Sequence, residues 1–135
     1  MTTPAPTDAR LDRIAAMTPH QLAQSHRGRA KLAAECAKLD LEKVRKLANS
    51  GDYAASHALI TAEAYADRAT RYASEAMRAA DYGASFETLT EQARAQINAA
   101  CNLSHIADEY ADATHAILRA LQHVQESAKW GEITQ

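Results

Sequence analysis

The sequence has little of what interrupts a helix or builds a β-sheet. Its 135 residues include three prolines, none of them after Pro19, and four glycines. β-Branched residues are scarce and scattered, so no segment has the composition of a strand. Alanine, leucine, glutamate, arginine and lysine dominate, and all five have high helix propensity. The sequence therefore predicts an all-α fold.

Long apolar runs are also missing. No stretch approaches the ~20 apolar residues that a membrane-spanning helix needs. The first residues, 1–7, are polar and contain proline, unlike the start of a secretory signal peptide. We therefore expect a cytoplasmic protein that does not contact membranes.

Cysteine is limited to Cys36 and Cys101, which lie in alanine-rich segments far apart in the sequence. We interpret both as reduced, buried residues that pack like small apolar side chains. A disulfide would require the fold to bring the two residues together.

Large apolar side chains are scarce as well, because Leu, Ile, Val and Phe make up only 20 of the 135 residues. So low a content is typical of disordered chains when the net charge is high, but the net charge here is only −2. Burying an alanine methyl yields much less free energy than burying a leucine, at ~25 cal/mol per Å². The thin core favours a homodimer, in which a second subunit supplies the missing buried surface.

Alanine is abundant, with 32 residues, and it is placed in order. Steps of four and three alternate along one stripe: Ala55, Leu59, Ala62, Ala66, Ala69, Ala73, Ala76 and Ala80. This period keeps one stripe facing one neighbour along a supercoiled helix. Small side chains also let two helices approach to ~8 Å, the short end of the usual interaxial range. We predict an antiparallel bundle of three long helices plus a short N-terminal helix, with alanine-rich close packing.

Capping residues and glycines place the boundaries. We expect a flexible tail over 1–7, and one bundle domain over 8–135 that opens with a short helix over Asp8–Met17. Thr18, Pro19 and Gln21 form a capping box with proline at the first helical position. The predicted elements that follow are a helix to about Ala48, a helix from Tyr53 to Asp81 that ends at Tyr82-Gly83, and a helix that opens at Ser85 or Thr88 and ends near Lys129 at Trp130-Gly131.

Four further features of these helices can be read from the sequence. Thr88 and Glu91 form a second candidate capping box at the start of the last helix. The apolar stripe of that helix changes phase midway, which predicts a kink between Asn98 and Ser104. The helix is also long enough, at over 60 Å, that it must overhang, bend or pair with another subunit. Gly28 marks either a break or a close helix crossing, because mid-helix glycine costs about 1 kcal/mol against alanine.

Charge is segregated along the chain and provides the first candidate site. Residues 20–48 carry seven basic and three acidic side chains, net +4, whereas residues 52–135 carry six basic and twelve acidic ones, net −6. Arg27, Arg29 and Lys31 surround a glycine and are candidates for binding phosphate or a partner's carboxylates. The alternatives are a solvated helix face, or charges that complement each other within the fold or across a dimer.

Tyr65, Arg68 and Tyr72 form the second candidate site, because helical spacing makes them neighbours. An arginine between two tyrosines can stack as it does at many protein and nucleic-acid interfaces. The alternative is that both tyrosines cover the edge of the core and keep their hydroxyls in water.

A run of metal-ligating residue types lies on one face of the last helix: His105, Asp108, Asp112 and His115. This face lies about 200° around the helix from the apolar stripe over residues 103–110, at 100° per residue, so it is predicted to point away from the core. Helical di-metal sites use inward Glu-x-x-His pairs, and this sequence contains none. It also has no serine elbow and no phosphate loop. We therefore predict a solvated face, with no metal and no cofactor.

The segment Leu47–Ala55, followed by alanine-rich helix, resembles the helical hairpins of HEPN domains and of tetratricopeptide repeats. HEPN ribonucleases carry an arginine and a histidine separated by four to six residues, but Arg119 and His123 have only three between them. No 34-residue period recurs in the sequence. We assign the chain to neither family.

These patterns favour a non-catalytic helical protein–protein interaction module. We expect a small adaptor, regulator or inhibitor that docks on a larger protein or nucleoprotein assembly. One alternative is a nucleic-acid-associated protein that binds through the basic helix over residues 20–48. Another is a degenerate HEPN-like nuclease or a metal enzyme, which would depend on Arg119, His123 or His115.

Overall fold

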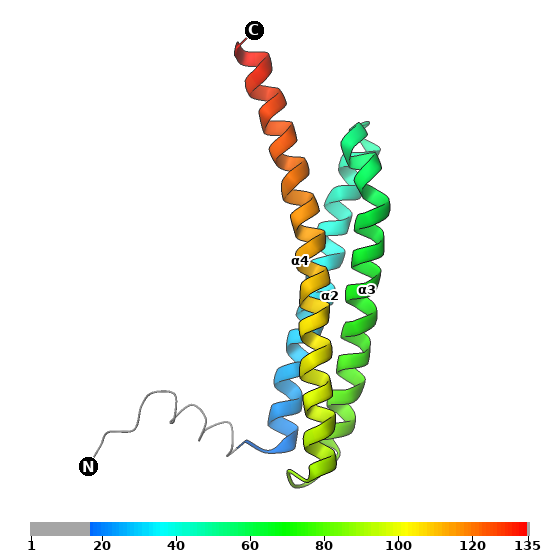
Figure 1. The fold of residues 1–135 in the computed structure, drawn as a ribbon, viewed down its shortest axis with the longest axis vertical. Helices are drawn as coiled ribbons and strands as arrows, with labels where there is room; N and C mark the ends of the chain where they lie inside the picture. Colours follow the sequence, from blue (N-terminus) through cyan, green and yellow to red (C-terminus); the bar gives the residue numbers. More distant parts are fainter. Residues whose placement is uncertain (1–16, 135) are drawn as a thin grey trace, which may run out of the picture.

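A computed structural model describes residues 17–134 of the protein (Figure 1). The predicted tail over 1–7 and nearly all of the predicted short helix over Asp8–Met17 lie outside the described residues. The elements are α2 (Pro19–Asn49), α3 (Tyr53–Ala84) and α4 (Glu91–Thr134). No strand occurs in residues 17–134, so the predicted all-α class is confirmed.

Each of the three helices packs against the other two. An ion pair joins Arg27 near the start of α2 to Asp81 near the end of α3, so these two helices run in opposite directions. Another joins Arg29 of α2 to Asp108 of α4, and further along both helices Asp40 meets His115. Helices α2 and α4 therefore run in the same direction, opposite to that of α3, and the three helices pack side by side (Figure 1).

The alanine stripe predicted on α3 is buried along its whole length, and we call such a line of inward residues a seam. Its seven alanines are at most 2% exposed, and Leu59 is partly buried. The seam of α4 follows the same alternating steps: Ala93, Ile97, Ala100, Ser104, Ala107, Ala111, Thr114, Leu118 and Leu121. The seam of α2 does so too: Pro19, Ala23, His26, Ala30, Ala33, Ala37, Asp40, Val44 and Leu47. The buried apolar residues in the middle of the core are all alanines, and the buried Ser104 and Thr114 lie beside them in the seam of α4.

Side-chain size changes towards the end where α2 turns into α3. There the buried residues include Val44, Leu118 and Leu121, which are larger than the alanines elsewhere. Larger side chains hold helix axes further apart, and α4 leans away from the other two helices in this direction (Figure 1). Because the core is packed without voids, the larger side chains near the α2–α3 connection go with a wider separation of the helices there.

The length of α4 carries it past the other two helices. With 44 residues against 31 and 32, it measures about 66 Å at 1.5 Å per residue. Gln125 donates a hydrogen bond to Asp52 at the α2–α3 connection, at 3.0 Å. The residues after Gln125, from 126 to 131, are exposed. Of the three possibilities set by its length, α4 therefore overhangs.

Two predicted helix starts are present in the structure. Thr18 and Gln21 exchange hydrogen bonds in a capping box, and Pro19 occupies the first turn of α2. Asp52 caps α3 by accepting from the backbone N–H of Ala55 at 2.9 Å. This bond and the one from Gln125 lower the pKa of the Asp52 carboxyl below its ordinary value, because both stabilise the charged form.

Other predicted boundaries are wrong by a few residues. Helix α4 begins at Glu91 and not at Ser85 or Thr88, because Thr90 accepts from the N–H of Ala93 at 3.1 Å and is the cap. Helix α3 continues through Gly83 to Ala84, and α4 continues through Gly131. A glycine ends a helix where the chain turns into a positive φ, and in residues 17–134 only Gly51 does so, at 94°.

The predicted phase change in α4 is also wrong. Helix α4 is uninterrupted through residues 98–104, and its seam keeps one phase because Ser104 and Thr114 occupy seam positions. Their hydroxyls donate to carbonyls of their own helix, at 2.9 Å to Cys101 and 3.0 Å to Tyr110. Burial of these small polar side chains is therefore not penalised by an unmade hydrogen bond.

Two of the glycines occupy opposite environments. Gly28 is exposed within an unbroken α2, and a Cβ added there would meet no atom within 4 Å. It marks neither a break nor a close crossing. Gly83 is buried, and an added Cβ would lie 2.9 Å from Cγ1 of Ile97 in α4. The close approach of two helices is found at Gly83.

The same substitution should therefore have opposite effects at these positions. Gly28→Ala should raise the free energy of unfolding by about 0.5–1 kcal/mol, because alanine loses less backbone entropy in a helix. Gly83→Ala gains the same term but overpacks against Ile97, at a cost of about 1–3 kcal/mol, so it should be destabilising overall. Urea unfolding followed by circular dichroism measures both. Equal effects would contradict the close α3–α4 contact.

Candidate functional site

The residues on either side of the buried α4 seam face different neighbouring helices. Residues one position after the seam point towards α2: Cys101, His105, Asp108, Asp112 and His115. Residues one position before it point towards α3: Leu103, Ile106, Tyr110, Ala113 and Ile117. The His/Asp run thus lies beside the core and partly against α2, as the contacts of Asp108 and His115 with α2 show. The predicted solvated face is present in part, because His105, Asp112 and His115 are exposed. Its predicted position opposite the core is wrong, because Leu103, Ile106 and Tyr110 flank the seam and do not form it.

The two arginines of the first candidate site bind within the molecule. Arg27 Nε lies 3.2 Å from Asp81 Oδ1 of α3, and Arg29 Nε lies 3.4 Å from Asp108 Oδ2 of α4. All four side chains are about half exposed, so each pair contributes about 0–1 kcal/mol. Lys31 is exposed. The structure thus separates Lys31 from the two arginines, whose charges complement those of α3 and α4.

The second candidate site surrounds a residue from another helix. The Tyr72 ring stacks on Tyr110 of α4 with an interplanar angle of 5° and centroids 5.8 Å apart, and Tyr65 lies 6.0 Å from Tyr110 on the other side. The guanidinium carbon of Arg68 lies 5.6 Å from the centre of the Tyr110 ring. Arg68 thus stacks on Tyr110 of α4 and not between Tyr65 and Tyr72 as predicted. Tyr72 and Tyr110 pack against the edge of the core, which agrees with the alternative. Tyr110 was not predicted as the centre of this cluster, because its spacing fits the apolar stripe of α4.

Asp40 is an ionisable residue in the α2 seam and only 7% exposed. Nδ1 of His115 lies 3.0 Å from Oδ2 of Asp40, close enough for the imidazole to donate to the carboxylate. The pair lies in an open hollow of about 290 Å³, lined also by Cys36, Leu39, Lys43, Ala111 and Asp112. Among the described residues, no three His, Cys, Asp or Glu side chains lie close enough together to hold a metal ion. The arrangement orients an imidazole without forming a metal centre.

The cysteines differ from their predicted environment. Both are free, but Cys36 is exposed and only Cys101 is partly buried. The interpretation of both as buried residues is wrong for Cys36, since it lies on the outer edge of the α2–α4 hollow. Its alanine-rich context gave no signal of this position.

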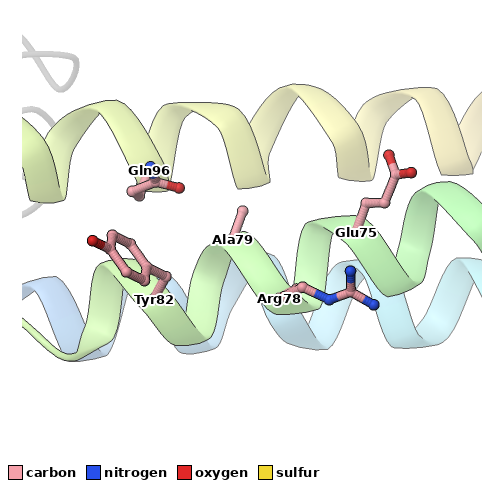
Figure 2. A pocket seen from close by; sticks show the side chains of 5 residues that line it. All are labelled: Glu75, Arg78, Ala79, Tyr82 and Gln96. Atoms are coloured by element: carbon pink, nitrogen blue, oxygen red, sulfur yellow. The ribbon is translucent and has the colours of Figure 1, made fainter.

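Two other hollows offer little chemistry. Arg119 and His123 line one of about 230 Å³ with Gln122 and Glu126, all from α4. Figure 2 shows the other, about 350 Å³ between α3 and α4, where the small Ala79 lies between Tyr82 and Gln96 on one side and Arg78 and Glu75 on the other. Neither set joins a nucleophile to a base.

The outward side of α2 combines apolar and basic residues. Leu32 and Leu39, one heptad apart, are 61% and 62% exposed. We call the exposed residues around them the outer α2 face: Lys31, Leu32, Glu35, Leu39, Glu42, Lys43 and Lys46. Arg45, at the edge of this face, is turned towards Glu42 at 2.9 Å and Glu63 of α3 at 3.7 Å. The arginines of α2 thus connect helices, and the lysines of the outer α2 face point outwards.

Comparison with known proteins gives no match: no family model, no curated protein and no solved structure is significantly similar to this chain. Within residues 17–134, no helix is both long and apolar enough to cross a membrane. The fold defines the class, an all-α protein with three long helices that pack against one another.

Substitutions at Asp40 and His115 test how much this polar contact contributes to the free energy of unfolding. His115→Ala should lower the free energy of unfolding by about 1–3 kcal/mol, because it leaves a buried carboxylate without its partner. The double variant Asp40→Ala/His115→Ala should recover most of this loss, since alanine matches the rest of the seam. Chemical unfolding measures both, and His123→Ala on the exposed side of α4 is the control. A double variant no more stable than His115→Ala would contradict this account of Asp40.

Proposed function

We propose that the protein is a cytoplasmic, non-catalytic helical bundle that acts as a small adaptor, regulator or inhibitor by docking on a larger protein assembly. The observation that carries this proposal is the outer α2 face. It exposes two leucines in a protein whose core is built mainly of alanine. Exposed large apolar side chains with a polar rim are typical of protein interaction sites.

The chemistry of the outer α2 face indicates the kind of partner. Leu32 and Leu39 are two helical turns apart, so they suit an amphipathic helix that lies along α2. Three lysines and two glutamates surround them, and this small excess of positive charge favours a partner with acidic residues beside its apolar stripe. Lysine and arginine have separate roles here, because the arginines Arg27, Arg29 and Arg45 already pair with carboxylates of this chain.

Binding of nucleic acid is a second candidate because the lysines of α2 point outwards. Against it stand the two leucines among them, a net charge of −2 and a pI near 6.3. Phosphate binding would weaken steeply with salt, whereas a partly apolar protein contact would weaken less. A salt titration of binding therefore distinguishes the two candidates.

Variants of the outer α2 face should separate binding from stability. Leu32→Ser/Leu39→Ser and Lys31→Glu/Lys46→Glu should each weaken partner recovery by at least tenfold in affinity purification, since central interface residues contribute about 1.4 kcal/mol or more. Their melting temperatures should stay close to that of the wild type, because the residues are exposed. Ile60→Ser, at an exposed position of α3, is the matched control.

Arg27→Glu and Arg29→Glu should behave differently from the lysine variants. Each breaks an ion pair between helices and places like charges together, so the melting temperature should fall. Partner recovery that depends on the arginines at unchanged stability, and not on Leu32 and Leu39, would refute the outer α2 face as the docking site.

We also propose that the protein forms a homodimer. The described residues expose eight large apolar side chains while the fully buried core is mostly alanine, so a second copy would bury surface that one copy leaves in water. Light scattering should give about twice the 14.7 kDa chain mass at micromolar concentrations. A mass equal to one chain at every concentration would exclude the dimer.

A further inference from the structure

An exposed glycine in α2 is not explained by the packing of a single chain. Gly28 lies in the middle of an unbroken helix, where glycine costs about 1 kcal/mol against alanine. A Cβ added there would meet no atom of the described residues within 4 Å. Its φ is not positive, so the backbone accepts other residues. Neither the packing nor the backbone of residues 17–134 therefore requires a glycine at this position.

Gly28 lies on the same side of α2 as the two exposed leucines. At about 100° per residue, Leu32 lies about 40° and Leu39 about 20° around the helix from Gly28. Gly28 therefore continues the outer α2 face by one turn towards the start of the helix. This side of α2 combines two large apolar side chains with a stretch of backbone that no side chain covers.

A second copy of this surface fits it in the antiparallel direction. When Leu39 of each copy packs over Gly28 of the other, a two-fold axis passes halfway between them, between residues 33 and 34. Both leucines then cover bare backbone, and the missing side chain at Gly28 lets the two helices approach closely. The two copies of Leu32 lie on either side of the axis and meet each other.

The charges of α2 agree with antiparallel pairing. In this register Lys31 of one copy lies at the level of Glu35 of the other, so two pairs of opposite charge flank the axis. Further out, Lys43 and Lys46 reach the level of exposed, uncharged residues at the start of the other helix: Gln21, Gln24 and Ser25. A parallel pair would instead place each lysine beside its own copy. Charge therefore favours the antiparallel direction.

We propose that a second copy of this chain binds the outer α2 face through the antiparallel Gly28–Leu39 contact, so that dimer formation and partner docking exclude each other. This inference rests on the proposed homodimer and on the proposed docking role of the outer α2 face. The dimer covers Leu32 and Leu39 when no partner is bound. Docking then requires the dimer to dissociate, so it depends on the concentration of the chain by mass action.

Light scattering over a series of concentrations tests the Gly28–Leu39 contact. Gly28→Leu should raise the dissociation constant of the dimer at least tenfold, because the added side chain holds the two helices apart. The fold should persist, since nothing within 4 Å obstructs the added Cβ, and circular dichroism checks the helix content. Ser74→Leu adds the same side chain at an exposed position of α3 and should leave the dimer unchanged.

A charge exchange tests the direction and register of the pairing. Lys31→Glu should raise the dissociation constant of the dimer about threefold or more, because it sets carboxylates against each other across the axis. Lys31→Glu/Glu35→Lys should restore the affinity of the wild type, because opposite charges face each other again. A double variant that dimerises no better than Lys31→Glu would overturn the proposed register.

The outcomes for the dimer and for docking can be told apart. A dimer that persists in both Gly28→Leu and Leu32→Ser/Leu39→Ser would overturn this inference, whereas lost partner recovery in the leucine variant would still support docking. A purified complex that holds the partner together with two copies of this chain would contradict mutual exclusion. A mass of one chain at every concentration would also refute the inference, and it would leave the docking role intact.

Discussion

The structure depends on packing between helix seams in which alanine is the most frequent residue. A methyl group lets two helix backbones approach closely, but it contributes little burial energy and almost no shape. Seams of near-identical small residues would fit one another in several registers, as loosely specified cores do. The seams therefore bring the helices together, and other contacts determine the axial register between them.

That choice is made at the edges of the seams. Arg27–Asp81 and Arg29–Asp108 connect α2 to its two neighbours, and Tyr110 lies between Tyr65 and Tyr72 of α3. Asp40 is a polar group within a seam, and a buried polar residue with one partner is a known means of fixing register between helices. Each contact is weak alone, but shifting a helix by one turn would lose all of them together.

The same division leaves a distinct surface outside. Because the arginines of α2 connect helices, the positive charge of α2 that remains available to a partner belongs to its lysines. Leu32 and Leu39 lie among these lysines. The use of the α2 arginines to connect helices therefore explains both how the thin core is held and why the outer α2 face carries lysines. A chain with few large apolar residues has placed two of them where they do not support its own core.

The sequence by itself determined what depends on local spacing. The period from Ala55 to Ala80 predicts a buried seam, and Thr18 with Gln21 predicts the start of α2, because both signals lie within a few residues of each other. Only the tertiary structure decided which way the flanks face. Each residue advances about 100° around a helix. The spacing alone placed Tyr110 in the seam where the structure has Ala111, so the predicted direction of His115 was towards solvent and not towards α2. For the same reason Arg29 and Tyr72, each predicted to meet an external partner, meet side chains from α4 of the same chain.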